Sequence, residues 1–126
     1  MIPVIRSGLF GIALAMSPAF AQHAPHRHAD GPHGGRVEEA GPWHAELVTA
    51  TDDVSVHLSD EAGRPMGVAG FKGTAILISG GKPVRILLAP EGDRLAGHAD
   101  TPLDDRPKGA VRLAAPDGVT ASARFE

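Results

Sequence analysis

Seven short apolar runs, each ended by glycine, proline or aspartate, fill the sequence after residue 42. Runs of this length and alternation are typical of half-buried strands, and no segment has the sustained 3.6-residue apolar period of a helix. We therefore predict an all-β domain, a small seven-stranded antiparallel β-sandwich of the immunoglobulin-like kind, with a small barrel as the alternative arrangement. The expected strands are 43–50, 53–59, 71–78, 83–89, 94–99, 110–115 and 119–125.

Residues 1–21 have the pattern of a secretory signal peptide. An early Arg6 precedes an apolar run over 8–16, and a small-x-small site follows at Ala19-Phe20-Ala21. The alternative is an anchor helix that stays on the chain, but the apolar run is shorter than the roughly 20 residues that span a bilayer. We expect cleavage after Ala21 and a mature chain, 22–126, in the periplasm or otherwise exported.

The mature chain is expected to begin with a flexible leader over 22–35, because this segment contains four histidines, two prolines and three glycines and almost nothing to bury. The composition changes at Arg36. Residues 36–126 are then long enough for one domain with a single core.

Composition excludes several classes of function. The chain has no cysteine, which rules out a disulfide scaffold, a thiolate metal site and a cysteine nucleophile. Without Arg6, 11 basic residues face 15 acidic ones, so a nucleic-acid surface is not expected. Neither a nucleophile elbow nor an HExxH motif is present, and we expect no enzyme activity. A small metallohydrolase is the one enzyme class that we keep as an alternative function.

The sequence ATDD at 50–53 predicts a hairpin in which Ala50 faces Asp53. Carried backwards, this register also pairs Leu47 with Val56, Ala45 with Leu58, Glu46 with His57, and His44 with Ser59. A slip of one residue would turn the apolar side chains outward, so the apolar pattern supports this register.

The register places His44, Glu46 and His57 on one face of the sheet. Directly opposed residues have Cβ atoms about 5 Å apart, so these side chains can converge on one ion. The HGG turn ahead of the strand can bring His33 to them, because glycines allow close approach and sharp bends. Three histidines and a glutamate suit Zn²⁺ or Cu²⁺. The alternative is a plain cross-strand charge pair between Glu46 and His57, with no metal.

The leader offers a second, separate metal site. His23, His26 and His28 lie within six residues, and His-rich tracts bind divalent metal. The alternative is a merely soluble linker. Only Met66 remains after cleavage, so a methionine site for Cu(I) is not expected, and divalent Zn, Cu, Co or Ni are the better candidates. His98 is expected to be a surface residue.

Four segments resemble a known family: PHGGRVEEAGPWHAELV, VSVHLSDEAGRPM, GFKGTAILI and APDGVTASARF. Together they are similar to the small exported His-containing β domain found alone, or at the N-terminus of the periplasmic adaptor subunits of RND-type heavy-metal efflux pumps. The resemblance covers 32–126. It implies a periplasmic metal-binding or metal-presenting role, with His33, His44 and Glu46 at the matching positions and components of an efflux system as partners.

These observations predict a periplasmic protein that binds a divalent transition metal, linked to metal efflux or homeostasis. The alternative is a structural or protein-interaction module that docks a sheet face or an edge strand on another exported protein, with incidental histidines. Neither nucleic acid nor stable membrane insertion after signal cleavage is expected.

Overall fold

The computed structural model describes Pro3 and residues 30–126. The predicted signal peptide and residues 22–29, with His23, His26 and His28, lie outside the described residues. Within the described part, no helix is long and apolar enough to cross a membrane.

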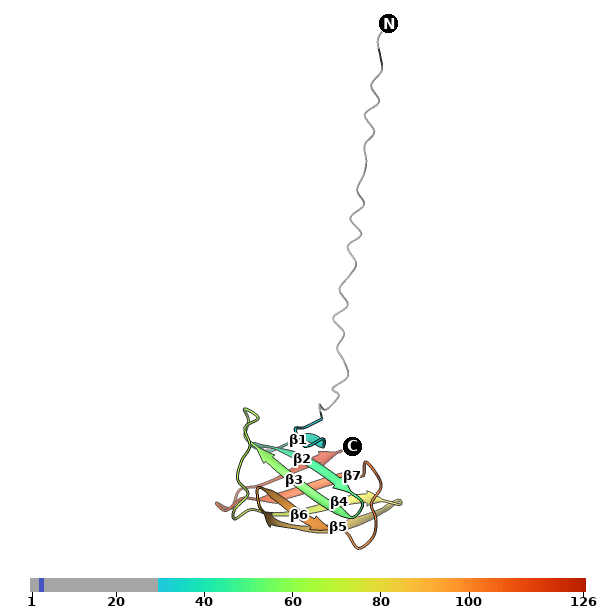
Figure 1. Cartoon of the computed structure of the whole chain (residues 1–126). Helices are drawn as coiled ribbons and strands as arrows, with labels where there is room; N and C mark the ends of the chain where they lie inside the picture. Colours follow the sequence, from blue (N-terminus) through green and yellow to red (C-terminus); the bar gives the residue numbers. More distant parts are fainter. Residues whose placement is uncertain (1–2, 4–29) are drawn as a thin grey trace.

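Eight antiparallel strands form one continuous sheet that wraps into a nearly closed, barrel-like layer (Figure 1). The order around the sheet is β1-β2-β3-β6-β5-β4-β7-β8. The strands are β1 (Arg36–Ala40), β2 (Trp43–Ala50), β3 (Asp53–Ser59), β4 (Lys72–Ser79), β5 (Lys82–Glu91), β6 (Arg94–His98), β7 (Lys108–Ala114) and β8 (Thr120–Phe125).

The all-β, antiparallel prediction is confirmed, but a sandwich of seven strands is wrong. Strand β5 is long enough to pair with β4 over 82–88 and with β6 over 89–91. It therefore carries the hydrogen-bonded ladder from one half of the sheet into the other, and the two halves form one layer instead of two separate ones.

The additional strand is β1, which pairs with β2 along its whole length. Its register places Arg36 and Glu38 opposite the buried Leu47 and Ala45. Polar residues thus occupy positions on the core side of this strand, so the strand lacks the apolar alternation by which the others are recognised.

Arg36 stabilises the place where the first and last strands meet. Its guanidinium lies 5.5 Å from the centre of the Phe125 ring and donates a 2.5 Å hydrogen bond to the carbonyl of Pro107. The residue is only 9% exposed. A buried cation needs such partners, and here they join β1 to β8 and to the start of β7.

The core is built mainly from small aliphatic side chains on alternating positions of the strands. Trp43 and Phe71 add one edge-to-face aromatic pair with centroids 5.2 Å apart. The largest fully buried apolar side chains are Phe125, Leu77, Ile86, Leu95, Leu113, Val54, Val56, Val68, Val111 and Pro107.

Candidate metal centre

The β2–β3 hairpin has the register that the sequence predicts. Glu46 lies opposite His57, and His44 lies opposite Ser59. Between them, Ala45 and Leu47 are buried in the core. Because side chains alternate across a strand, His44, Glu46 and His57 project from the outer face of the sheet.

The turn at 31–35 lies directly over this outer face. Gly31 donates to the Gly35 carbonyl at 2.8 Å, which closes the turn. A Cβ at Gly31 would stand 2.3 Å from the Glu46 carboxyl carbon, and one at Gly35 would stand 2.4 Å from the Leu47 carbonyl oxygen. Neither position has room for a side chain, so the two glycines allow the turn to reach β2.

Glu46 is held by the turn through both carboxylate oxygens. The amides of His33 and Gly35 each donate to Oε2 at 2.9 Å, and Nδ1 of His33 lies 2.8 Å from Oε1. The residue is 4% exposed. Burial alone would raise the pKa of Glu46, but the hydrogen bonds from the His33 ring and from the two amides outweigh burial and lower this pKa.

The ionised carboxylate determines the tautomer of His33. A carboxylate only accepts hydrogen bonds, so Nδ1 of His33 must carry the proton that it donates. The other ring nitrogen, Nε2, is not used by this contact. The His33 side chain is 44% exposed, so solvent reaches the ring.

His57 stacks on His33, with ring centroids 3.6 Å apart and an angle of 7° between the rings. Burial, and then the charge of the nearby His33, lower the pKa of His57 below its ordinary value of 6.5. His57 is therefore a neutral imidazole at pH 7.

His44 is oriented in the same manner as His33. Its Nδ1 lies 3.1 Å from the backbone carbonyl of Asp60, and because a carbonyl only accepts, Nδ1 is the donor. Its Nε2 lies 4.0 Å from Oε1 of Glu39, a side chain that is 87% exposed. In the neutral form of His44 the lone pair is therefore on Nε2, as it is in His33.

These three histidines line one surface cleft of about 940 Å³. Other potential ligands in its lining are Asp30, Glu38, Glu39, Glu46, Asp93 and Met66. The cleft therefore collects imidazole, carboxylate and thioether groups around the turn and β1 to β3, and its lining extends to Ser122 and Arg124 of β8.

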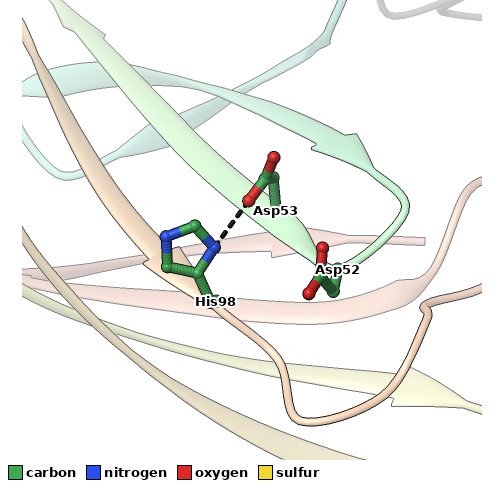
Figure 2. Close-up of side chains that lie close together, drawn as sticks. All are labelled: Asp52, Asp53 and His98. Carbon is green, nitrogen blue, oxygen red and sulfur yellow. Dashed lines mark ion pairs between the residues drawn. The ribbon is translucent and has the colours of Figure 1, made fainter.

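The structure does not gather the cleft histidines into a compact ligand set. Among the described residues, the group with three potential ligand atoms within 4.8 Å of one another is Asp52, Asp53 and His98, at the other end of β3 (Figure 2). Figure 2 shows the contact that organises this group, a 2.5 Å ion pair between His98 Nδ1 and Asp53 Oδ1. The two side chains are 72% and 59% exposed, so a simple surface ion pair explains their proximity.

Two parts of the site lie beyond sequence reasoning. The backbone amides that hold Glu46 and the Asp60 carbonyl that orients His44 have no signature in side-chain identity. The contact of His98 with Asp53 depends on the pairing of β3 with β6, strands about 40 residues apart in the chain. The sequence feature that could have pointed to this group is the pair of adjacent aspartates in the ATDD turn.

Comparison of the chain with protein-family models, with curated proteins and with solved structures gives no match. Fold and cleft together define the molecule as an all-β domain with a histidine-lined cleft on the outside of its sheet.

Proposed function

We propose that this protein binds a divalent transition-metal ion, of which Zn²⁺ and Cu²⁺ are the best candidates, in the cleft formed by His33, His44 and His57. One observation carries the proposal. His33 and His44 each donate Nδ1–H to an oxygen acceptor, so the lone pair of each neutral ring is on Nε2. Histidines that bind metal ions almost always have their second nitrogen engaged in this way, because the contact sets both the tautomer and the ring orientation.

In this proposal Glu46 positions His33 instead of binding the ion itself. Both of its oxygens already accept hydrogen bonds from the turn. A carboxylate behind the imidazole also makes the ring a stronger electron donor. Glu39, whose Oε1 lies 4.0 Å from Nε2 of His44, is the better placed carboxylate ligand.

Binding through both His33 and His57 requires their stack to open. The lone pair of an imidazole nitrogen lies in the ring plane, and these planes are nearly parallel at 3.6 Å. Two such lone pairs cannot both point at one ion about 2 Å away. One ring must rotate, and His57 is the candidate since Glu46 holds His33.

Residues outside the described part extend the proposal. In the sequence His28 precedes Asp30 by two residues, and Asp30 lines the cleft. The leader histidines His23, His26 and His28 are thus joined directly to the rim of the cleft, where they would act as a weaker capture arm. Periplasmic export and a partner in an RND-type metal efflux system belong to the same proposal and rest on the signal-peptide pattern and the family resemblance.

The test is isothermal titration of the purified protein with Zn²⁺ and with Cu²⁺. The informative variants are His33→Ala/His44→Ala for the cleft and His23→Ala/His26→Ala/His28→Ala for the leader, with His98→Ala as a matched surface control. We expect the cleft variant to lose at least tenfold in affinity and the control to lose none. If the leader variant binds neither ion above a millimolar background, the cleft does not bind metal and the proposal is wrong.

A further inference from the structure

A second surface of the molecule combines exposed aliphatic side chains with cations. It covers the outer face of β4, β5 and β7, where three large apolar residues are exposed: Leu87 by 72%, Ile76 by 47% and Ile78 by 42%. Their neighbours in sequence, such as Leu77 and Ile86, point into the core and are fully buried. Successive side chains of a strand point to opposite faces of the sheet, so the exposed residues are those that alternate with the core residues along these strands.

The strand register places a cation directly opposite two of these aliphatic side chains. Ile76 lies opposite Arg85, and Ile78 lies opposite Lys108. Thr74 lies between Leu87 on one side and Arg112 on the other. We call the surface formed by Ile76, Ile78, Leu87, Lys72, Arg85, Lys108 and Arg112 the aliphatic-cationic face.

The cations of this face are not neutralised by the protein itself. None of the ion pairs within residues 30–126 involves Lys72, Arg85, Lys108 or Arg112. The outward positions of β4, of β7 and of residues 83–89 carry no carboxylate. Asp104 lies at one end of the face, where it accepts a hydrogen bond from Gly80. On a chain with more acidic than basic residues, this is a local concentration of positive charge.

We propose that the aliphatic-cationic face docks on an anionic phospholipid surface. Lipid phosphates supply the negative charge that the four cations lack, and the three aliphatic side chains enter the boundary between headgroups and acyl chains. The interaction is peripheral: the sheet lies on the bilayer and does not cross it.

The composition of the face favours lipid over an acidic protein. Protein interfaces are depleted in lysine and take much of their binding energy from tryptophan, tyrosine and other aromatic anchors. Here two of the four cations are lysines, and no outward residue of β4, β5 or β7 is aromatic. Long basic side chains around a few aliphatic groups are instead what a bilayer interface accommodates.

Docking in this way leaves the histidine cleft accessible. In the strand order, three strands separate β4 from β2 in either direction around the barrel-like sheet. The histidines of the cleft, on β2, on β3 and in the turn at 31–35, would then face away from the bilayer.

The experiment is co-sedimentation of the purified protein, in chelator, with phosphatidylcholine vesicles that contain about 30% phosphatidylglycerol, compared with phosphatidylcholine alone. We expect binding only to the anionic vesicles, with at least a tenfold loss between about 50 mM and 500 mM salt. Arg85→Gln/Arg112→Gln should lower the partition coefficient by about tenfold or more. Leu87→Ser should lower it several-fold at unchanged charge. The single variants Arg85→Gln and Arg64→Gln each remove one charge, so Arg64→Gln, an exposed arginine paired with Asp60, is the charge-matched control for Arg85→Gln.

Several results would overturn the proposal. They are absence of binding to anionic vesicles at low salt, equal binding to both kinds of vesicle, and an equal loss in Arg64→Gln. Binding to soluble polyglutamate is measured as well, to distinguish lipid from an acidic polymer. If it binds as well as the vesicles do, and Leu87→Ser changes neither interaction, the face recognises an acidic polymer or protein and not lipid. Far-ultraviolet circular dichroism of each variant confirms that the sheet is intact.

Discussion

His33 contacts Glu46 twice, through its backbone amide to Oε2 at 2.9 Å and through its ring Nδ1 to Oε1 at 2.8 Å. One carboxylate therefore fixes both the main chain of the turn and the orientation of the imidazole on it. The position of the ring and the fold of the turn are consequently coupled, and a change in Glu46 affects both.

Replacing Glu46 tests this coupling. Glu46→Ala removes three hydrogen bonds to a buried carboxylate and leaves two amides without a partner, so we expect the free energy of unfolding to fall by about 2–4 kcal/mol. Glu46→Gln keeps an oxygen for the two amides and should cost less. Urea denaturation measures both, with the exposed Glu61→Gln as the control, expected within about 0.5 kcal/mol of the wild type. A Glu46→Ala protein as stable as the control would contradict the structural role of this carboxylate.

Stability should depend on pH in two separate windows. The pKa of His57 is lowered in the folded protein, so this group has no effect above its ordinary value of 6.5, where both states are neutral. Below 6.5 the unfolded chain takes up the proton first, and the free energy of unfolding declines until the pH passes the folded pKa. Urea midpoints from pH 8 to pH 5 should show this decline in the wild type, and His57→Gln should abolish it.

The second window belongs to Glu46, whose pKa is also lowered. Its ionised form stabilises the folded state, so the contribution is fully present above the ordinary value of 4.5 and is lost as the pH falls through the folded pKa. The steepest acid loss of stability is therefore expected below pH 4.5. Glu46→Gln should flatten this part of the curve and leave the part near pH 6 in place. A Glu46→Gln protein with an unchanged acid transition would show that other carboxylates are responsible.

The glycines of the turn should differ in their sensitivity to alanine. A Cβ at Gly31 would collide with the Glu46 carboxyl group, whereas one at Gly34 meets nothing within 4 Å. Gly34→Ala should therefore lower the free energy of unfolding only through the strain of an alanine at a φ of +77°, by about 1–2 kcal/mol. Gly31→Ala should lower the free energy of unfolding further and should also release the His33 ring, which would be seen as loss of the signal of the hydrogen-bonded Nδ1 proton in NMR spectra. The opposite order of the two variants would be inconsistent with the packing of the turn.

Substitution of His98 should have little effect on either stability or metal binding. The ion pair of His98 with Asp53 is well exposed, so His98→Ala is expected to change the free energy of unfolding by less than about 1 kcal/mol. It should also leave Zn²⁺ and Cu²⁺ affinity unchanged. A tenfold loss of affinity in His98→Ala would transfer the metal site to Asp52, Asp53 and His98.

Metal affinity should fall as the pH is lowered from 7 to 5. An imidazole binds metal only when neutral, so protons compete with the ion at each histidine ligand. We expect a loss of at least about tenfold across this interval in calorimetric titrations. A constant affinity over the same interval would exclude histidine ligands.

The β2–β3 hairpin could be predicted residue by residue, because a short turn and a strict alternation leave one register that buries Ala45 and Leu47 together. The same register puts His44, Glu46 and His57 on one face. The approach of His33 was expected from the glycines of the HGG turn and is observed as its stack with His57.

Other features depend on contacts that are distant in the sequence. Strand β1 escaped prediction because its core-side positions are Arg36 and Glu38, and the partner that makes Arg36 acceptable, Phe125, is at the far end of the chain. The continuous sheet likewise depends on where β5 changes partners, between Leu88 and Ala89, and no residue pattern marks that point.

The cation of Arg36 also has a bearing on self-association. Strands β1 and β8 form no backbone ladder with each other within residues 30–126, so each has one edge that is not paired with another strand. Such edges are templates for strand addition from another molecule. By holding its own strand against Phe125, Arg36 keeps each edge covered by the other. Loss of Arg36 would therefore leave both edges open to strand pairing with another molecule.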